Sequence, residues 1–258
     1  MRLAEKVIIV TGSTTGIGKA IAQRCVLEGA SVVIHGLEKD LGQALCRSIG
    51  PDKSLLHIQD LEEDSAPAAL VEQALRRFGK LDAIVNNAAW VVSSNIDNTT
   101  PDFLRKVINI NTVAPLALIR AALPALRKTH GTVLNIGSVN AWSGEPNLLA
   151  YSISKGALLT LTRNLGDVLF RDDGVRVNQI NPGWVLTEKE FQRKEEQGLE
   201  HDWYRDLSPF HAPAGRLLKP DEIAAAAVYW LSDESGPVSG QVVDLEQYPL
   251  LGRNLPKN

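Results

Sequence analysis

The feature that most constrains the fold of this chain is a regular alternation of short apolar runs with longer segments of helical spacing. Seven apolar runs predict buried strands, over residues 7–10, 31–35, 55–58, 83–85, 132–136, 175–180 and 241–244. Between them apolar residues recur at the spacing of one helix face, as in Ile17, Ile21 and Cys25. Strands that alternate with helices pair in parallel and carry helices on both faces. The sequence therefore predicts an α/β fold with a doubly wound, seven-stranded parallel sheet.

The domain organisation is predicted from what the chain lacks. No linker rich in Ser, Pro or Gly, no repeat and no low-complexity tract divides it, so we expect a single domain over residues 1–258. The irregular segment 188–214 is rich in charged and aromatic residues and follows the sixth predicted strand. Ligands bind at the carboxyl ends of the strands in such sheets. We therefore expect a substrate loop at about 188–214.

Composition and charge exclude several classes of partner. A formal charge of −3 and a pI near 6.0 leave no excess of Lys and Arg for nucleic acid or an anionic membrane surface. No run of roughly 18 apolar residues marks a membrane span, and residues 1–6 lead directly into a strand without a signal-peptide core. Cys25 and Cys46 lack the close pairs of a zinc site. We expect a cytoplasmic protein without a metal, whose partner is a small molecule.

A glycine-rich turn follows the first predicted strand. Residues 11–18 read Thr-Gly-Ser-Thr-Thr-Gly-Ile-Gly, and a helical pattern begins at once. Gly12 permits the tight exit from the strand, Gly16 lets the backbone approach a pyrophosphate, and Gly18 lets helix and sheet pack closely. A simple strand-to-helix turn is the alternative. Because another strand begins directly after Gly29, we favour a dinucleotide site.

A second candidate motif pairs a phenol with an ammonium group. Tyr151 and Lys155 are four residues apart on one face of a predicted helix. A nearby cation favours the phenolate and lowers the pKa of a tyrosine, which makes the pair a proton-transfer device. Alone, however, this spacing is common on helix surfaces.

These motifs occur in one order along the chain, and together they resemble the short-chain dehydrogenase/reductase family. The matching elements are the Thr-Gly-x-x-x-Gly-x-Gly turn, Asn86-Asn87-Ala88, Asn111, Ser138, the Tyr151/Lys155 pair, and Asn181-Pro182-Gly183 with Thr187. The resemblance implies a Rossmann-type domain that moves a hydride between a nicotinamide cofactor and an alcohol or carbonyl.

The resemblance also implies catalytic roles for four residues. Tyr151 would be the acid/base, and Lys155 would lower its pKa and contact the nicotinamide ribose. Ser138 would bond the reacting oxygen, and Asn111 would hold a relay water.

The resemblance further implies a set of cofactor-binding residues. They are Gly12, Thr14, Thr15, Gly16, Ile17, Gly18, Gly36, Leu37, Asp60, Leu61, Asn87, Ala88, Ala89, Tyr151, Lys155, Pro182, Gly183, Val185 and Thr187. The Asp that usually selects NAD is absent at Gly36, but no Arg stands at Leu37 to pair the extra phosphate of NADP, and Glu38 would repel that phosphate. We expect NAD rather than NADP. Ala89 replaces a family glycine, and Asp244-Leu245-Glu246 replaces Asp-Gly-Gly, which leaves the role of the tail open.

The residues expected at the substrate indicate its chemistry. They are Ser138, Asn140, Trp142, Tyr151, Trp184, Arg193, His201 and Arg205. Flat apolar faces beside many hydrogen-bonding groups suit a sugar, sugar acid or polyol, which we expect as the substrate; a solvated charged flap with incidental tryptophans is the alternative.

The sequence also leaves an alternative substrate, an alternative function and a mode of assembly to be considered. The glycine turn and the end of the second strand also resemble 3-hydroxybutyrate dehydrogenases, so a small hydroxy acid is the nearest alternative substrate. However, Val91, Asn140 and Leu148 stand where those enzymes place Gln, His and Lys. A non-catalytic dinucleotide sensor is the rival from another class. We also expect a homotetramer or homodimer, formed through the apolar helix at 148–169.

Overall fold

The computed structural model describes residues 1–249 and contains the predicted sheet. Its strands are β1 (Val7–Val10), β2 (Ser31–Gly36), β3 (Ser54–Ile58), β4 (Ala83–Asn86), β5 (Thr132–Ile136), β6 (Arg176–Pro182) and β7 (Val242–Leu245). Their order is β3-β2-β1-β4-β5-β6-β7, and every neighbouring pair is parallel. The predicted fold class is confirmed. Residues 250–258 of the expected domain lie outside the described residues.

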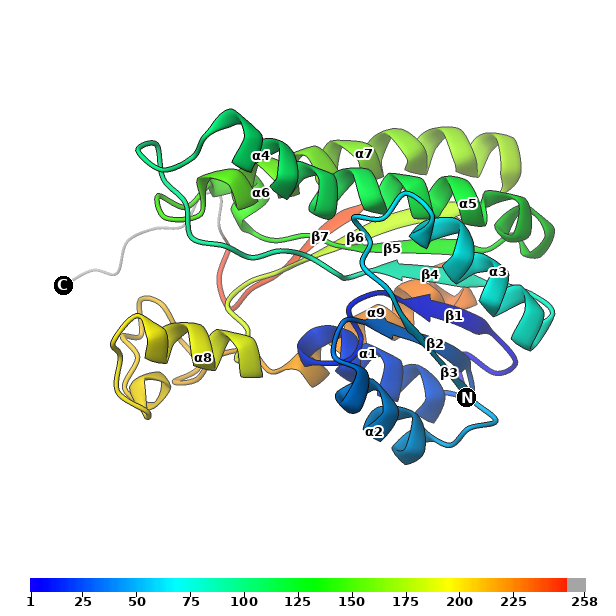
Figure 1. Ribbon diagram of the computed structural model, residues 1–258, viewed down its shortest axis with the longest axis horizontal. Helices are drawn as coiled ribbons and strands as arrows, with labels where there is room; N and C mark the ends of the chain where they lie inside the picture. Colours follow the sequence, from blue (N-terminus) through cyan, green and yellow to red (C-terminus); the bar gives the residue numbers. More distant parts are fainter. Residues whose placement is uncertain (250–258) are drawn as a thin grey trace.

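Helices cover both faces of the sheet (Figure 1). One layer holds α3 (Ala66–Phe78), α4 (Pro101–Ile108), α5 (Ala114–Thr129), α6 (Asn140–Ser143) and α7 (Leu149–Asp173). The other holds α1 (Gly16–Leu27), α2 (Lys39–Ile49) and α9 (Pro220–Leu231), while α8 (Glu188–Glu196) stands apart at the carboxyl edge. A π-helical turn (Asn109–Val113) joins α4 to α5, and short 3-10 turns lie at Trp203–Arg205 and Asp233–Ser235.

The alternation of side chains along each strand builds the two cores. In β1, Ile8 and Val10 pack with α1 and α9, while Val7 and Ile9 pack with α3 and α5. Successive strand residues point to opposite faces, so a strand buried on both faces must be apolar throughout. The apolar runs of the sequence follow from this double burial.

One helical stretch, Pro101–Thr129, is long and apolar enough by length and mean hydropathy to cross a membrane. Core helices pass the same test. In this fold the stretch comprises α4, the π-helical turn and α5, and α5 contributes Leu118, Ile119 and Leu126 to the core under β4 and β5. Its buried apolar side chains are therefore accounted for by packing against the sheet, while Val113 is exposed.

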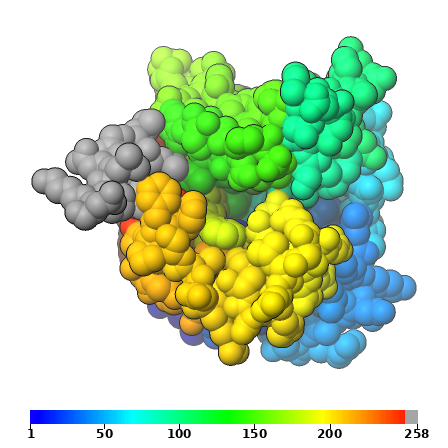
Figure 2. Space-filling model, turned by 90° about the vertical axis from the view of Figure 1, so that its left-hand side faces the viewer, coloured from blue at the N-terminus to red at the C-terminus, as the bar shows by residue number. Residues whose placement is uncertain are grey.

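The carboxyl ends of the strands frame a hollow. The expected substrate loop, 188–214, begins with α8 and folds back through the 3-10 turn Trp203–Arg205. Figure 2 shows a hollow between this loop, in yellow, and the green segments of the opposite layer.

Candidate active site

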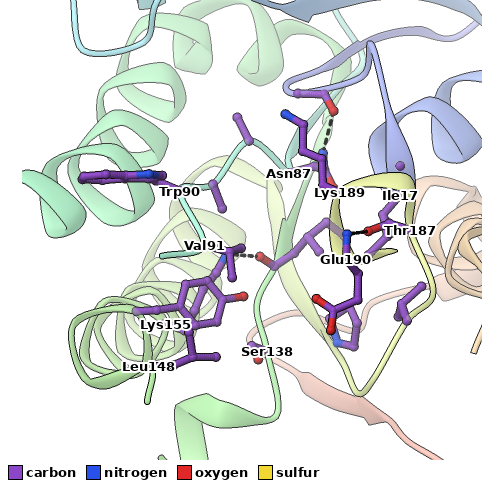
Figure 3. A pocket seen from close by; sticks show the side chains of 18 of the residues that line it. Ile17, Asn87, Trp90, Val91, Ser138, Leu148, Lys155, Thr187, Lys189 and Glu190 are labelled. Carbon is purple, nitrogen blue, oxygen red and sulfur yellow. Dashed lines mark hydrogen bonds between the residues drawn. The ribbon is translucent and has the colours of Figure 1, made fainter. Parts of the chain in front are cut away.

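The hollow is a cleft of about 1030 Å³ that runs along the carboxyl edge of the sheet. Its wall extends from the glycine turn after β1 to the loop after β6 and α8. Figure 3 shows Ser138, Lys155 and Leu148 on one side of it, with Thr187 and Glu190 on the other. Groups from distant parts of the chain therefore face one volume large enough for a dinucleotide and a small substrate.

The glycine turn is held against the end of β4. Gly12 and Gly16 have φ of 61° and 55°, a region that favours glycine, and a Cβ on Gly12 would lie 2.8 Å from the Ala88 Cα. The Asn87 side chain donates to the carbonyls of Thr11 and Gly12 at 2.9 and 3.0 Å. These contacts explain why glycines and Asn87 occur together in the sequence.

The same turn leaves backbone donors available to an anion. Thr15 is the N-cap of α1, and within residues 1–249 its side chain makes no capping hydrogen bond. The first N–H groups of α1 therefore keep their bonding capacity beside the cleft, where the partial positive charge of a helix N-terminus favours a phosphate group. The residues present fit the pyrophosphate of a dinucleotide.

Tyr151, Lys155 and Ser138 converge on the wall of the cleft. Tyr151 and Lys155 lie in the first turns of α7 and are 8 % and 2 % exposed, and the Lys155 Nζ lies 5.7 Å from the centre of the Tyr151 ring. The Lys155 Nζ donates to the carbonyl oxygen of Ile136 at 2.7 Å, and the Tyr151 hydroxyl bonds with Ser138. The end of β5 thus carries Ser138 and also fixes Lys155.

Burial governs the proton affinities of this group. It raises the pKa of Tyr151 to about 12, although the hydrogen bond with Ser138 and the charge of Arg193 act in the opposite direction. Burial also lowers the pKa of Lys155 to about 7, because the charged ammonium is removed from water. The predicted lowering of the Tyr151 pKa by Lys155 is therefore corrected, because burial outweighs it and the pKa is raised. In addition, the ammonium is itself desolvated and is directed to the Ile136 carbonyl.

Asn111 lies behind the cleft wall rather than on it. It sits in the π-helical turn and is 1 % exposed. Its amide group donates to the Trp90 carbonyl and the Ser154 hydroxyl, and its oxygen accepts from the Trp90 N–H. Because both amide protons are used, a relay water would not be held by this side chain directly.

The chain matches known proteins along almost its whole length. A family model described as enoyl-(acyl carrier protein) reductase matches residues 12–246. The NADP-dependent (R)-specific alcohol dehydrogenase of Lentilactobacillus kefiri is 32 % identical over 93 % of this chain and 94 % of its own length. The L-fucose dehydrogenase of Bos taurus is 35 % identical over 90 % of this chain and 85 % of its own length. The chain belongs to the short-chain dehydrogenase/reductase family.

A solved structure places this member beside a sugar-reducing relative. The structure of L-sorbose reductase from Gluconobacter frateurii, complexed with NADPH and L-sorbose, superposes with a TM-score of 0.88. It is 26 % identical and covers 95 % of this chain and 97 % of its own. As a short-chain dehydrogenase/reductase the chain is an enzyme, an oxidoreductase that acts on alcohol or carbonyl groups and binds a nicotinamide cofactor.

The structure brings the predicted cofactor residues of this short-chain enzyme to one surface. The cleft wall includes Gly12, Thr14, Thr15, Gly16, Ile17, Gly36, Leu37, Asp60, Leu61, Asn87, Ala88, Ala89, Tyr151, Lys155, Pro182, Gly183, Val185 and Thr187. Gly18 lies beneath the wall, where a Cβ would come within 2.3 Å of the Gly12 carbonyl oxygen. It acts on the turn through packing, as its position in the motif suggests.

Three predicted substrate residues are not brought to the cleft. Trp142 turns away, because its Nε1 donates to Asp244 at 3.0 Å and the Arg163 guanidinium lies over its ring. His201 is mostly exposed and bonds Glu195. Arg205 extends over the ring of its neighbour Tyr204, outside the cleft. Ser138, Asn140, Tyr151, Trp184 and Arg193 do lie on the wall.

Two carboxylates that bond Trp184 on the wall are absent from the sequence-based prediction. Glu190 accepts from the Trp184 Nε1 at 2.9 Å and pairs with Arg193. Glu246, in the tail after β7, accepts from the Trp184 N–H and lies so close to Gly183 that a Cβ there would overlap its Oε2. The missing Asp-Gly-Gly was a signal for Glu246, because a side chain replaces a glycine beside the nicotinamide loop.

His35 couples the glycine turn to pH. Its Nε2 lies 3.0 Å from the Gln59 carbonyl, its Nδ1 faces the Gly12 N–H, and burial lowers its pKa to about 4. The unfolded chain binds the proton at about 6.5 and the folded protein only near 4, so stability falls as pH decreases across this window. We expect a loss of about 3 kcal/mol by pH 4.

Urea unfolding of the wild type and of His35→Gln, from pH 7 to 4, measures this effect. The variant should show a shallower fall in unfolding free energy with acid. His201→Gln, on the exposed loop, should retain the wild-type slope. Equal slopes for His35→Gln and the wild type would contradict the assignment.

Proposed function

We propose that the protein is an NAD-dependent dehydrogenase of a sugar, sugar acid or polyol, and that neutral polyhydroxylated compounds are its preferred substrates. The observation that carries this proposal is the Glu190–Arg193 pair on the cleft wall. Both residues act electrostatically on the Tyr151 phenol, so they lie near the reacting end. Together they offer donors and acceptors with no net charge.

The arrangement supports proton transfer at a substrate hydroxyl. The Tyr151 oxygen would accept the hydroxyl proton of the alcohol, and the Ser138 hydroxyl would stabilise the developing negative charge on the substrate oxygen. Lys155 would stabilise the phenolate through its remaining N–H groups. The bound nicotinamide would supply the acceptor for the hydride.

Charge pairing on the wall argues against an anionic substrate. Arg193 is paired with Glu190, Lys189 with Glu38 and Lys106 with Glu62, while Lys194 bonds Gln197 and lies over the Trp184 ring. Glu246 adds a carboxylate beside Trp184. A sugar acid or 3-hydroxybutyrate would have to compete for the three paired cations or approach a negative group, whereas neutral hydroxyls can bond both members of a pair.

The preference for NAD rests on the end of β2. Leu37 offers no cation to a 2′-phosphate, and Glu38 accepts from Thr14 at 2.6 Å and from Lys189 at 2.8 Å. These contacts hold the pKa of Glu38 down to about 2, so its carboxylate stays charged. A ribose hydroxyl can bond this carboxylate, whereas a phosphate would be repelled by it. The alcohol dehydrogenase of Lentilactobacillus kefiri is named as NADP-dependent, and the L-sorbose reductase structure is a complex with NADPH. The test therefore compares both cofactors.

The proposal extends to assembly and location. Ile153 and Val168 are exposed on α7, and Val113 is exposed just before α5. Burying these side chains against a second copy would support a homodimer or homotetramer. A cytoplasmic location remains a prediction from the sequence.

Replacement of Arg193 tests the substrate class. Arg193→Met should raise the KM for the best neutral sugar or polyol by about tenfold or more, because a charged hydrogen-bond donor near the substrate is lost. The KM for NAD should stay within twofold. Arg205→Met, on the same loop but outside the cleft, is the matched control.

The panel for this test comprises aldoses, polyols, sugar acids, 3-hydroxybutyrate and hydroxysteroids, each with NAD and with NADP. Turnover restricted to steroids or hydroxy acids would contradict the sugar proposal. A higher kcat/KM with NADP would contradict the cofactor preference.

A further inference from the structure

A chain of buried polar side chains runs across the sheet beneath the catalytic residues. On its inner half, the Asn86 Nδ2 donates to the Asn135 Oδ1 at 2.8 Å, and the Asn135 Nδ2 donates to the Thr162 hydroxyl at 2.8 Å. The three side chains are at most 3 % exposed and come from β4, β5 and α7. Polar groups this deep are retained only with partners, because each unpaired one is costly.

The series of hydrogen-bonded side chains continues through β6. The Thr162 hydroxyl lies 2.7 Å from the Gln179 Oε1, and the Gln179 Nε2 donates to the Asn181 Oδ1 at 2.7 Å. The Asn181 Nδ2 then donates to the Asp244 Oδ1 on β7 at 2.9 Å. After Asn86, each amide thus accepts from the previous side chain and donates to the next, and the series ends on a carboxylate.

This series of hydrogen-bonded side chains contacts the segment that carries Ser138 at one atom. The Asn181 Oδ1 also accepts from the Ser138 backbone N–H at 3.1 Å. Gly137 has no side chain where this contact forms, and a Cβ there would lie 2.0 Å from the Asn181 Oδ1 and 2.3 Å from the Gln179 Nε2. The amides therefore pack directly against the turn that presents Ser138.

Asp244, the exposed last member of this series of side chains, makes a second contact with the same segment. The Asp244 Oδ1 also accepts from the Trp142 Nε1, four residues beyond Ser138. Asp244 therefore holds residues 138–142 both directly, through Trp142, and indirectly, through Asn181. Trp142, which does not reach the cleft, gains a role in this contact.

We propose that Asn181 is a positioning residue that fixes Ser138 for proton transfer, with Asp244 orienting the Asn181 amide. The orientation matters because only the oxygen can accept from the Ser138 N–H. If Asp244 no longer accepts from the Asn181 Nδ2, the Asn181 amide can rotate. The Ser138 N–H then loses its hydrogen bond to the Asn181 Oδ1. Displacement of a reacting group by about 1 Å can cost about 100-fold in rate.

Asn181→Asp tests the orientation directly. The introduced carboxyl keeps an acceptor for Ser138 but directs its second oxygen at the Asp244 carboxylate. We expect kcat to fall by about tenfold, while the Kd of NADH, followed by fluorescence titration, stays within twofold. A purely structural defect would lower the melting temperature, but it would not lower kcat while leaving the Kd of NADH unchanged.

A reciprocal exchange makes the test specific. Asp244→Asn alone retains an acceptor, and combined with Asn181→Asp it restores one donor and one acceptor across the contact. We expect the double variant to regain about fivefold in kcat over Asn181→Asp, a coupling of about 1 kcal/mol. Asn178→Asp is the matched control, because Asn178 is equally buried on β6 but bonds the Val238 carbonyl and the Gln241 N–H.

The outcomes separate cleanly. A folded Asn181→Asp with kcat within twofold of the wild type overturns the proposal, as does a double variant without recovery or an Asn178→Asp with an equal loss of kcat. If Asn181→Asp fails to fold, Asp244→Ala replaces it, since Asp244 is exposed. A severalfold loss of kcat relative to the surface control Asp233→Ala supports the proposal, and an unchanged kcat overturns it.

Discussion

Tyr151→Phe is expected to lower kcat by about 10² to 10⁴-fold while leaving the fold and the Kd of NADH nearly unchanged. The substitution removes only the hydroxyl that would exchange the proton with the substrate, and the ring stays packed at 8 % exposure in the wall of the cleft. The loss corresponds to about 3 to 5 kcal/mol in the barrier. Steady-state rates, cofactor titration and thermal unfolding measure the three quantities.

Tyr229→Phe provides the control for this prediction. Tyr229 lies on α9, is 38 % exposed and packs against Trp230, away from the cleft. It should retain full activity. Near-normal turnover in Tyr151→Phe would remove this residue from the mechanism.

Lys155→Met is expected to shift the pH dependence of alcohol oxidation strongly upward. The Lys155 Nζ lies 5.7 Å from the centre of the Tyr151 ring, where its positive charge would stabilise a phenolate. Burial already raises the pKa of Tyr151 to about 12 with Lys155 in place. In the variant the phenol must ionise against the same burial without this cation. Oxidation by the variant should therefore stay slow through the neutral range and rise only at high pH.

The methionine preserves the volume of the buried lysine stem, so the change is mainly one of charge. The Kd of NADH should also rise, because the ammonium is expected to bond the nicotinamide ribose. Lys189→Met, whose ammonium is exposed and paired with Glu38, should leave the pH profile unchanged. A Lys155→Met profile that coincides with the wild type would show that Lys155 does not act on the proton step.

The strands and the cofactor cradle were predictable because local physics determines them. A strand buried on both faces must be apolar, and the close approach of the Gly12 turn to Ala88 requires a residue without a side chain. These constraints act within a few residues and therefore appear in the sequence. Ser138, Tyr151 and Lys155 met in the structure because each follows or faces the end of β5.

The substrate end was less predictable because its side chains depend on contacts across loops. Trp142 and Trp184 look alike in sequence, but Asp244 draws one indole away from the cleft while Glu190 holds the other on its wall. The position of Glu246 depends on the path of the tail after β7. The role of Asn181 was equally hidden, because its hydrogen-bond partners are distant in sequence.

This site is expected to move a hydride from a substrate carbon to the nicotinamide. The most direct measurement uses the best substrate of the panel with deuterium on the carbinol carbon, and determines the isotope content of the reduced cofactor by mass spectrometry. We expect one deuterium in each reduced nicotinamide formed by the wild type, and almost no reduced cofactor with Tyr151→Phe. Tight binding of NADH without reduction of NAD or NADP by any alcohol would contradict enzymatic hydride transfer and favour a dinucleotide sensor. Reduced cofactor free of deuterium would contradict hydride transfer from that carbon.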